Sequence, residues 1–146
     1  MEFKDFSRSI NHTKLDKFAD YLASGKIMGT TCKKCGSRYY PPRADCKKCF
    51  SDGMDWVELK GRGKLITFTS INVPPDYFDV GFKNLTPPFS KARYTACPIG
   101  ILRLDNGLSI MGWIPGIALK KISVGLELVA VPITLPDGTV TIKLCD

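Results

Sequence analysis

Histidine is nearly absent from this chain, which has one, His12, among 146 residues. This scarcity excludes a histidine-rich metal site, and any catalytic pairing of serine or cysteine with histidine depends on His12 alone. His12 belongs to no motif, and we expect a surface residue ahead of a helix. No pair of carboxylates stands out as a general acid and base. The sequence therefore predicts little catalytic machinery within the chain.

Long apolar runs are missing as well. The longest uncharged stretch, 106–119, includes Gly112, Pro115 and Gly116, and it is shorter than the roughly 18 apolar residues that a membrane-spanning helix needs. The first residues are charged where a signal peptide has an apolar segment. We therefore expect a soluble, cytoplasmic protein with no membrane partner. In that compartment cysteines are more often metal ligands or free thiols than disulfides.

The composition is that of a globular protein with an excess of positive charge. Hydrophobic residues make up 44% and charged residues 24%, which argues against disorder. Lysine and arginine number 21 and acidic residues 14, so the formal net charge is +7. This charge favours an anionic partner, which would be a nucleic acid, a membrane surface or a phosphorylated small molecule.

A short helix and a later series of strands frame a cysteine-rich stretch. Leu15, Phe18 and Leu22 share one face of a predicted helix over 13–23, which either packs on its own domain or docks on a partner. Beyond Trp56, β-branched and apolar stretches predict five strands. These strands cover 64–73, 98–104, 108–113, 126–133 and 139–144. Such short strands with tight turns and no long helix indicate a small closed barrel or a sandwich.

The connection between the first two strands is unusually long and aromatic. It runs over 74–93 and carries four aromatic residues, which are Tyr77, Phe78, Phe82 and Phe89. Loops of this length are usually functional or disordered, and the aromatic residues argue against disorder. They either cover the core of the chain or form part of an interface or ligand cover.

Four of the six cysteines form two C-x2-C pairs, which are Cys32 with Cys35 and Cys46 with Cys49. This spacing lets both thiolates of a pair reach one metal from a tight turn, and two pairs supply the tetrahedral sulfur set of a structural zinc site. We favour zinc over a rubredoxin-like iron. Disulfides or four buried thiols fit an intracellular chain poorly. Four sulfur ligands leave no open position for a substrate, so the metal is expected to stabilise the fold.

Basic residues surround these cysteines and begin the first barrel strand. Near the cysteines they either neutralise the thiolates or face a phosphate-bearing ligand. The G-x-G of Gly61-Arg62-Gly63 lacks the third glycine of a dinucleotide fingerprint, so we interpret it as a bulge or bend. The basic residues in question are Lys33, Lys34, Arg38, Arg43, Arg62 and Lys64. The two other cysteines, Cys97 and Cys145, are expected to be free thiols rather than nucleophiles.

The order of these features resembles the DUF35 family. The resemblance rests on Cys32-x2-Cys35-Gly36, Tyr40-Pro41-Pro42-Arg43 and Cys46-x2-Cys49, followed by Trp56, residues 61–69 and residues 124–128. It implies an N-terminal helical segment (1–25), a rubredoxin-like zinc ribbon with one structural zinc ion (26–55) and a five-stranded OB-fold (56–146). It also implies a non-catalytic accessory subunit of a thiolase-type acyl-CoA acyltransferase.

In that role the chain would dock on a thiolase-like catalytic subunit and help to form or cover the acyl-CoA site. The six basic residues named above are the candidates for the anionic groups of CoA. The candidates for partner contact are Leu15, Phe18, Leu22 and the four loop aromatics. The alternative is a nucleic-acid-binding module, because zinc ribbons and OB-folds both occur in such proteins. Only Phe68 and Trp113 place aromatic rings in the predicted strands, where stacked bases need them, so we favour the accessory subunit.

Overall fold

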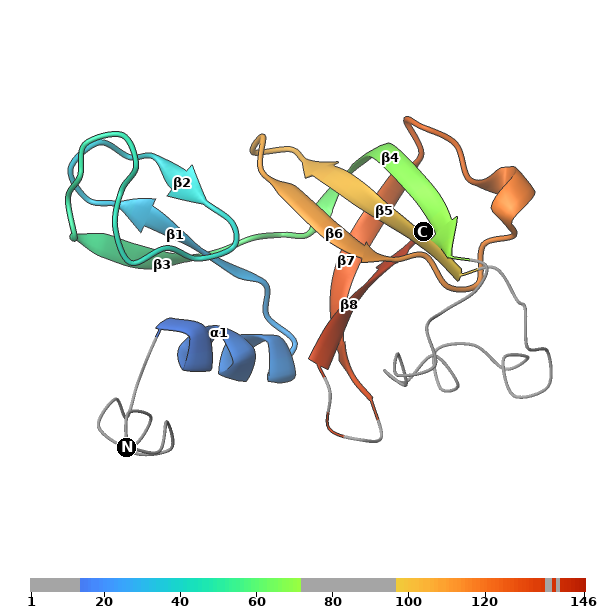
Figure 1. Cartoon of the computed structure of the whole chain (residues 1–146), viewed down its shortest axis with the longest axis horizontal. Helices are drawn as coiled ribbons and strands as arrows, with labels where there is room; N and C mark the ends of the chain where they lie inside the picture. Colours follow the sequence, from blue (N-terminus) through green and yellow to red (C-terminus); the bar gives the residue numbers. More distant parts are fainter. Residues whose placement is uncertain (1–13, 72–96, 136–137, 139) are drawn as a thin grey trace, which may run out of the picture.

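The computed structural model describes residues 14–71, 97–135, 138 and 140–146. This part of the chain forms a short α-helix, a three-stranded sheet and a closed five-stranded barrel (Figure 1). The predicted mainly β architecture with an N-terminal helix is confirmed. None of the helices in these residues has the length and apolar character needed to cross a membrane.

The three-stranded sheet carries the cysteine pairs. Its strands β1 (Met28–Cys32), β2 (Arg38–Tyr39) and β3 (Met54–Glu58) lie in the order β2-β1-β3, and both pairings are antiparallel. Strand β2 ends two residues before Pro41, which has no N–H to donate to the sheet. We call this sheet, with its connecting loops, the ribbon.

The barrel consists of β4 (Arg62–Ile71), β5 (Cys97–Leu104), β6 (Ser109–Trp113), β7 (Glu127–Thr134) and β8 (Val140–Cys145). Its strands follow the order β4-β5-β6-β8-β7, and pairing between β4 and β7 closes the circle. Only the contact between β6 and β8 is parallel among these pairings. The strand pattern of the sequence allowed either a closed barrel or a sandwich, and the pairing of β4 with β7 shows that the strands form a closed barrel.

One buried side-chain cluster fills the barrel and extends to its junction with the ribbon. Inward-pointing residues from every strand are at most 1% exposed, and they are Leu65, Leu102, Ile110, Leu128 and Leu144. Ile27 and Leu59, from the segments that flank the ribbon sheet, pack against the same cluster. Apolar residues next to the ribbon sheet therefore pack directly against the barrel core.

Glycine is required where β4 enters the barrel. Gly61 has a φ of 70°, and a Cβ there would lie 2.5 Å from the carbonyl oxygen of Ala130. At Gly63 a Cβ would collide with the backbone carbonyl of Arg103. The two glycines let β4 approach β5 and β7 closely at one point. The structure thus supports a tight bend over the G-x-G segment, and a register shift follows between Leu65 and Thr67.

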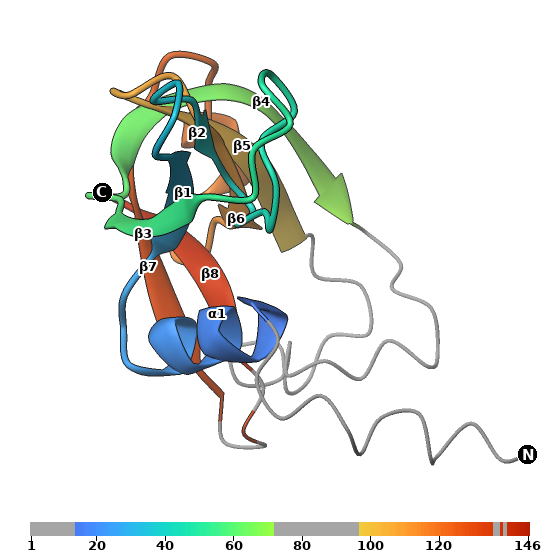
Figure 2. The same cartoon turned by 90° about the vertical axis from the view of Figure 1, so that its left-hand side faces the viewer.

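The helix α1 (Lys14–Ala23) contacts both the ribbon and the barrel. It ends in a left-handed glycine turn, because Lys26 donates to the carbonyl of Tyr21 and Gly25 has a φ of 80°. Tyr21 packs edge-on against Trp56 of β3, with ring centroids 5.2 Å apart. The helix also lies against β7 and β8 (Figures 1 and 2). It therefore braces the junction between the two modules.

Candidate metal centre and the neighbouring basic hollow

The four predicted metal ligands come together in the ribbon. Their sulfur atoms all lie within 4.8 Å of one another. The Sγ atoms of Cys32 and Cys49 are 3.5 Å apart, and those of Cys35 and Cys46 are 3.4 Å apart. A tetrahedral ion with Zn–S bonds of about 2.3 Å would place its sulfur ligands roughly 3.8 Å apart. The donor set and its spacing therefore fit a single tetrahedral metal ion, and the four cysteines form a metal-binding group.

The two cysteine pairs are held by the same backbone turn. In the first, Gly36 donates to the carbonyl of Cys32, and in the second Phe50 donates to the carbonyl of Cys46, both at 2.9 Å. The position after each pair is left-handed, with a φ of 70° at Gly36 and 55° at Phe50. An aromatic side chain is unfavourable in this conformation, and the Phe50 side chain is 87% exposed. This repeated turn is not visible in the sequence, because only the first pair is followed by glycine.

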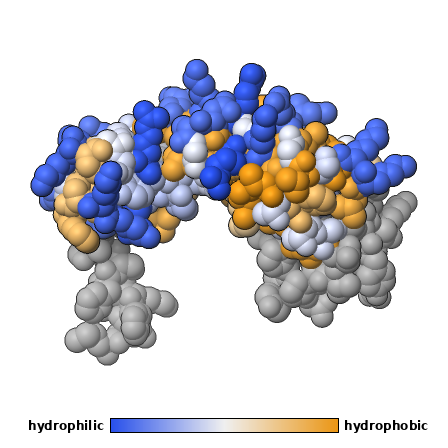
Figure 3. Space-filling model, turned by 90° about the horizontal axis from the view of Figure 1, so that it is seen from above, coloured by the Kyte–Doolittle hydropathy of each residue, from blue (hydrophilic) through white to orange (hydrophobic). Residues whose placement is uncertain are grey.

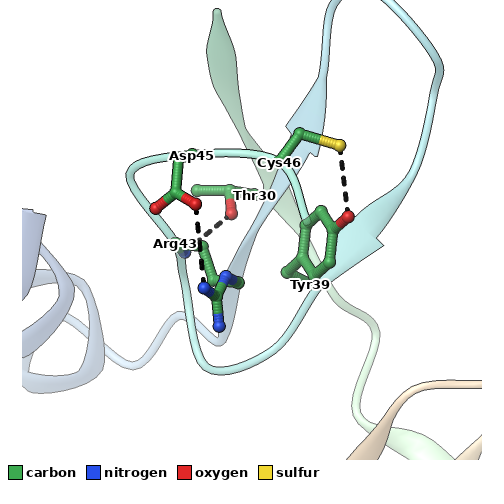
Figure 4. Close-up of polar contacts among 5 residues, drawn as sticks. All are labelled: Thr30, Tyr39, Arg43, Asp45 and Cys46. Atoms are coloured by element: carbon green, nitrogen blue, oxygen red, sulfur yellow. Dashed lines mark hydrogen bonds and ion pairs between the residues drawn. The ribbon is translucent and has the colours of Figure 1, made fainter. Parts of the chain in front are cut away.

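Hydroxyl groups next to the sulfurs favour the thiolate form. The Tyr39 hydroxyl lies 3.2 Å from Cys46 Sγ (Figure 4), and this hydrogen bond lowers the pKa of Cys46 to about 6. A hydrogen bond of 3.2 Å to Ser37 lowers the pKa of Cys35 in the same direction. Metals bind cysteine as thiolate, so both bonds prepare the site for an ion. The roles of Tyr39 and Ser37 were not predictable from the sequence, because only the folded turn brings their hydroxyls to the sulfurs.

Arg43 anchors the second cysteine loop to the sheet. Its backbone N–H donates to the hydroxyl of the fully buried Thr30 at 2.9 Å. Its guanidinium lies 3.8 Å from Asp45 and 5.9 Å from the Tyr39 ring centroid. Figure 4 shows Arg43 and Asp45 in the loop that leads to Cys46, next to Thr30 of β1 and Tyr39 of β2. Arg43 was predicted to bind an anion, and these contacts show that it also holds the loop in place against β1 and β2.

Two of the other predicted basic residues line one hollow between the ribbon and the barrel. Arg38 of β2 and Arg62 of β4 border a hollow of about 200 Å³ together with Lys60, which the sequence analysis did not single out. Glu58 and Asp105 also line it, so the charged side chains around it sum to +1. We call it the basic hollow. Cationic side chains from both modules lie around this hollow.

The remaining predicted basic residues lie elsewhere. Lys33 pairs with Asp55 at 3.1 Å, and Lys64 lies 3.7 Å from Glu127. Lys34 is exposed in the first cysteine turn. The structure therefore spreads the six candidates over several surfaces instead of gathering them in one patch.

The predicted partner residues are divided between packed, exposed and undescribed positions. Phe18 packs edge-on against Tyr40 at 5.9 Å, and Leu22 packs against the buried cluster. Leu15 is 72% exposed. Tyr77, Phe78, Phe82 and Phe89 lie outside the described residues, as does His12. Most of the apolar face of the helix is thus used within the chain.

The two remaining cysteines belong to barrel strands. Cys97 is the first residue of β5. Cys145, in β8, is partly buried, and its sulfur lies 3.7 Å from the carbonyl oxygen of Val129. Neither residue is among the cysteines that form the metal-binding group.

Comparison with known proteins places these two modules in one family. Residues 19–55 match the rubredoxin-like zinc ribbon domain of ChsH2, and residues 56–131 match its C-terminal OB-fold domain. A DUF35 domain-containing scaffold protein of Methanocaldococcus jannaschii is 29% identical over 72% of this chain and 66% of its own length. The benzoylsuccinyl-CoA thiolase subunit BbsA of Thauera aromatica is also 29% identical, over 62% of this chain and 52% of its own length.

Solved structures agree on the fold. The structure described as the Ltp2-ChsH2(DUF35) aldolase matches with a TM-score of 0.69 and 20% identity, covering 94% of this chain and 96% of that one. A DUF35 protein of unknown function from Sulfolobus solfataricus matches with a TM-score of 0.57 and 18% identity over 96% and 92% of the two chains. The chain spans about two thirds or less of the curated relatives named above. The match to both ChsH2 domains confirms the resemblance, and the chain belongs to the ChsH2 (DUF35) family, in which an OB-fold follows a rubredoxin-like zinc ribbon.

Proposed function

We propose that this chain is a non-catalytic, zinc-binding subunit of a thiolase-type acyl-CoA acyltransferase. The observation that carries the proposal is the match to relatives named as a thiolase subunit and as scaffold proteins. These names describe proteins that work as parts of larger assemblies. The chain would dock on a catalytic subunit that supplies the nucleophile and the acid–base groups.

The metal centre supports an architectural role. Its four cysteines provide four sulfur ligands, which complete the tetrahedral coordination of zinc and leave no position for a substrate or water. When bound, the ion would contribute folding energy to the ribbon. Tyr39 and Ser37 would keep two of the sulfurs in the form that binds it.

The basic hollow is the candidate contact for CoA. It combines Arg38, Lys60 and Arg62 from the two modules, and a phosphate group is recognised by convergent cationic donors. Among the described residues, these three side chains make no ion pair within 4 Å. Their donors are therefore available to an anion that enters the hollow. We assign this hollow to a phosphate of CoA.

Co-expression with a thiolase-type subunit from the same genome tests the accessory role. We expect the two chains to elute as one complex in size-exclusion chromatography. Acyl-CoA thiolysis should require both chains or be strongly stimulated by this one. Separate elution, together with activity that does not change when this chain is omitted, would overturn the proposal.

The role of the basic hollow is tested in that complex. The double variant Arg38→Gln and Arg62→Gln is expected to raise KM for acyl-CoA by about tenfold or more, because each hydrogen bond to a charged group contributes about 1.5–3 kcal/mol. The value of kcat should change little. Lys34→Gln is the control, since Lys34 is exposed away from the hollow. An unchanged KM in the double variant, or an equal rise in the control, would contradict the assignment.

A further inference from the structure

The outside of the barrel carries two apolar rows that run across three strands. Strand pairing between β4, β5 and β6 fixes the members of each row. The first row holds Thr67, Ile101 and Met111, and the second holds Thr69, Ile99 and Trp113. We call these six residues the β4–β6 face.

Alternation along the strands places this face outside the barrel. Leu102 and Ile110 point into the barrel and are 0% exposed, so their neighbours Ile101 and Met111 point outward. Met111 is 64% exposed. A shallow hollow of about 160 Å³ lies in this surface, and most of the residues that line it belong to the face. Figure 3 shows hydrophobic residues gathered over the barrel, whereas the ribbon surface is mostly hydrophilic.

These outward residues are not needed to build the barrel core. The interior is already occupied by leucine and isoleucine side chains from all five strands. Single exposed apolar residues are normal on a folded protein, whereas apolar residues gathered in one patch mark an interaction site. Covering such a surface would release about 25 cal/mol for each Å² removed from water.

Basic residues border the apolar rows on one side. The next cross-strand row towards the ribbon holds Lys64 and Arg103, which pair in register, and Ser109. Lys64 lies 3.7 Å from Glu127, while Arg103 makes no ion pair within the described part of the chain. A surface that matches this face therefore needs aliphatic side chains for the rows and a carboxylate for Arg103.

This combination favours a protein surface over single-stranded nucleic acid. Nucleic acid binds to barrel strands by stacking bases on aromatic rings beside a basic track. Ile99, Ile101 and Met111 offer aliphatic contact and no ring for stacking. Phe68 of β4 also lines the shallow hollow, but it packs partly against the barrel core and is not a freely exposed ring. Trp113 is the one aromatic member of the face.

We propose that the β4–β6 face is the docking surface for the catalytic subunit, which inserts an aliphatic side chain between Ile101 and Met111 and places a carboxylate against Arg103. The proposal rests on the function proposed above and goes beyond it by naming the surface. It assigns docking to the barrel and not to the helix. Leu15, the exposed apolar residue of the helix face, is then outside the interface.

Three single variants test this assignment through the dissociation constant of the complex. Met111→Glu places a charge on the apolar rows, and Arg103→Glu reverses the bordering charge. Leu15→Glu is the matched control, because Leu15 is 72% exposed and Met111 is 64% exposed. Binding of each purified variant to the catalytic subunit is measured by isothermal titration calorimetry, and thermal unfolding of each variant is recorded alone.

We expect Met111→Glu to raise Kd at least about tenfold, as substitution of a central interface residue does. Arg103→Glu should raise Kd and reduce its dependence on salt, and Leu15→Glu should leave Kd unchanged. If the wild-type chain binds and neither barrel variant raises Kd, the surface assignment fails while the proposed function stands. If the wild-type chain does not bind the catalytic subunit, the proposed function fails as well.

Other occupants of the face give different results. A wild-type dimer that Met111→Glu converts to monomers, with no change in Kd for the catalytic subunit, would mean that a second copy occupies the face. A large fall in the unfolding temperature of Met111→Glu alone, again with unchanged Kd, would mean that the chain covers the face itself. If the wild-type chain binds a labelled oligonucleotide and Met111→Glu abolishes this binding, the ligand of the face is nucleic acid. Each of these results overturns the proposal.

Discussion

Removal of the metal is expected to unfold the ribbon and leave the barrel folded. Apart from the ligands Cys32 and Cys46, few ribbon residues are buried, and they include Met28 and Thr30. Ordering each residue costs about 1–2 kcal/mol of backbone entropy, which so small a core cannot offset. A structural zinc site contributes about 10–16 kcal/mol. We therefore expect a bound metal ion to be the main source of ribbon stability.

The barrel has its own core, so metal removal lowers its stability much less than that of the ribbon. Five of its residues, one from each strand, are at most 1% exposed, and burial of each such side chain is worth about 1.5–3 kcal/mol. When the ribbon unfolds, the barrel loses the packing of Ile27 and Leu59 at the junction. Loss of one such buried contact costs about 2–5 kcal/mol. We expect a lower unfolding temperature for the barrel, but a folded barrel at 25 °C.

The two tryptophans report on the two modules separately. Trp56 lies in β3 of the ribbon and Trp113 in β6 of the barrel. In Trp113→Phe the emission of Trp56 should shift to longer wavelength when a strong chelator removes the metal, and it should recover when zinc is returned. In Trp56→Phe the emission of Trp113 should change little. A joint shift of both reporters would refute the separate stability of the barrel, and no shift in either would refute a structural metal.

Three further predictions concern the metal centre and the barrel entrance. Tyr39→Phe removes the hydrogen bond that lowers the pKa of Cys46, so zinc affinity in a chelator competition should fall by about 10–100-fold. During acidification the variant should release zinc at a higher pH than the wild type, because protons compete better for a thiolate of higher pKa. Unchanged zinc affinity would contradict this prediction. Phe50→Gly should stabilise the metal-bound protein by about 1 kcal/mol in denaturant unfolding, because it removes a left-handed non-glycine residue. Gly36→Ala should destabilise the metal-bound protein by a similar amount, because it introduces such a residue. Equal unfolding midpoints for the two variants would show that the turn carries no strain. Gly63→Ala should cost about 1–3 kcal/mol or more in the same measurement, because its Cβ would collide with a carbonyl of β5; a wild-type midpoint would show that the strands can move apart.

The metal ligands were predictable because the information is local. Two residues between cysteines define a turn whatever lies around it, and the four sulfurs meet as that spacing indicates. The supporting hydroxyl of Tyr39 was not predictable in the same way. Its contact with Cys46 spans seven residues and depends on how β2 leads into the following loop. Nothing in the sequence around Tyr39 indicates this contact.

The strands of the barrel were predictable, but the direction of their side chains was not. Strand β5 is apolar at nearly every position except Arg103, so no alternation tells Ile101, outside, from Leu102, inside. That distinction comes from pairing with β4 and β6, which is a long-range property. For the same reason the outer apolar rows and the basic hollow emerge only in the folded chain. The apolar face of the helix was visible in the sequence, but its packing on Tyr40 was not.

The position of α1 has a thermodynamic consequence for the whole chain. The helix touches Trp56 and Tyr40 in the ribbon, and it lies against β7 and β8 of the barrel. A change in the ribbon therefore alters contacts that the barrel also makes. If α1 transmits changes between the two modules, occupancy of the metal site and occupancy of the barrel surface are linked equilibria, and the coupling between them must be equal in both directions. A partner that prefers the braced arrangement would tighten zinc binding by the same factor by which zinc tightens the binding of that partner.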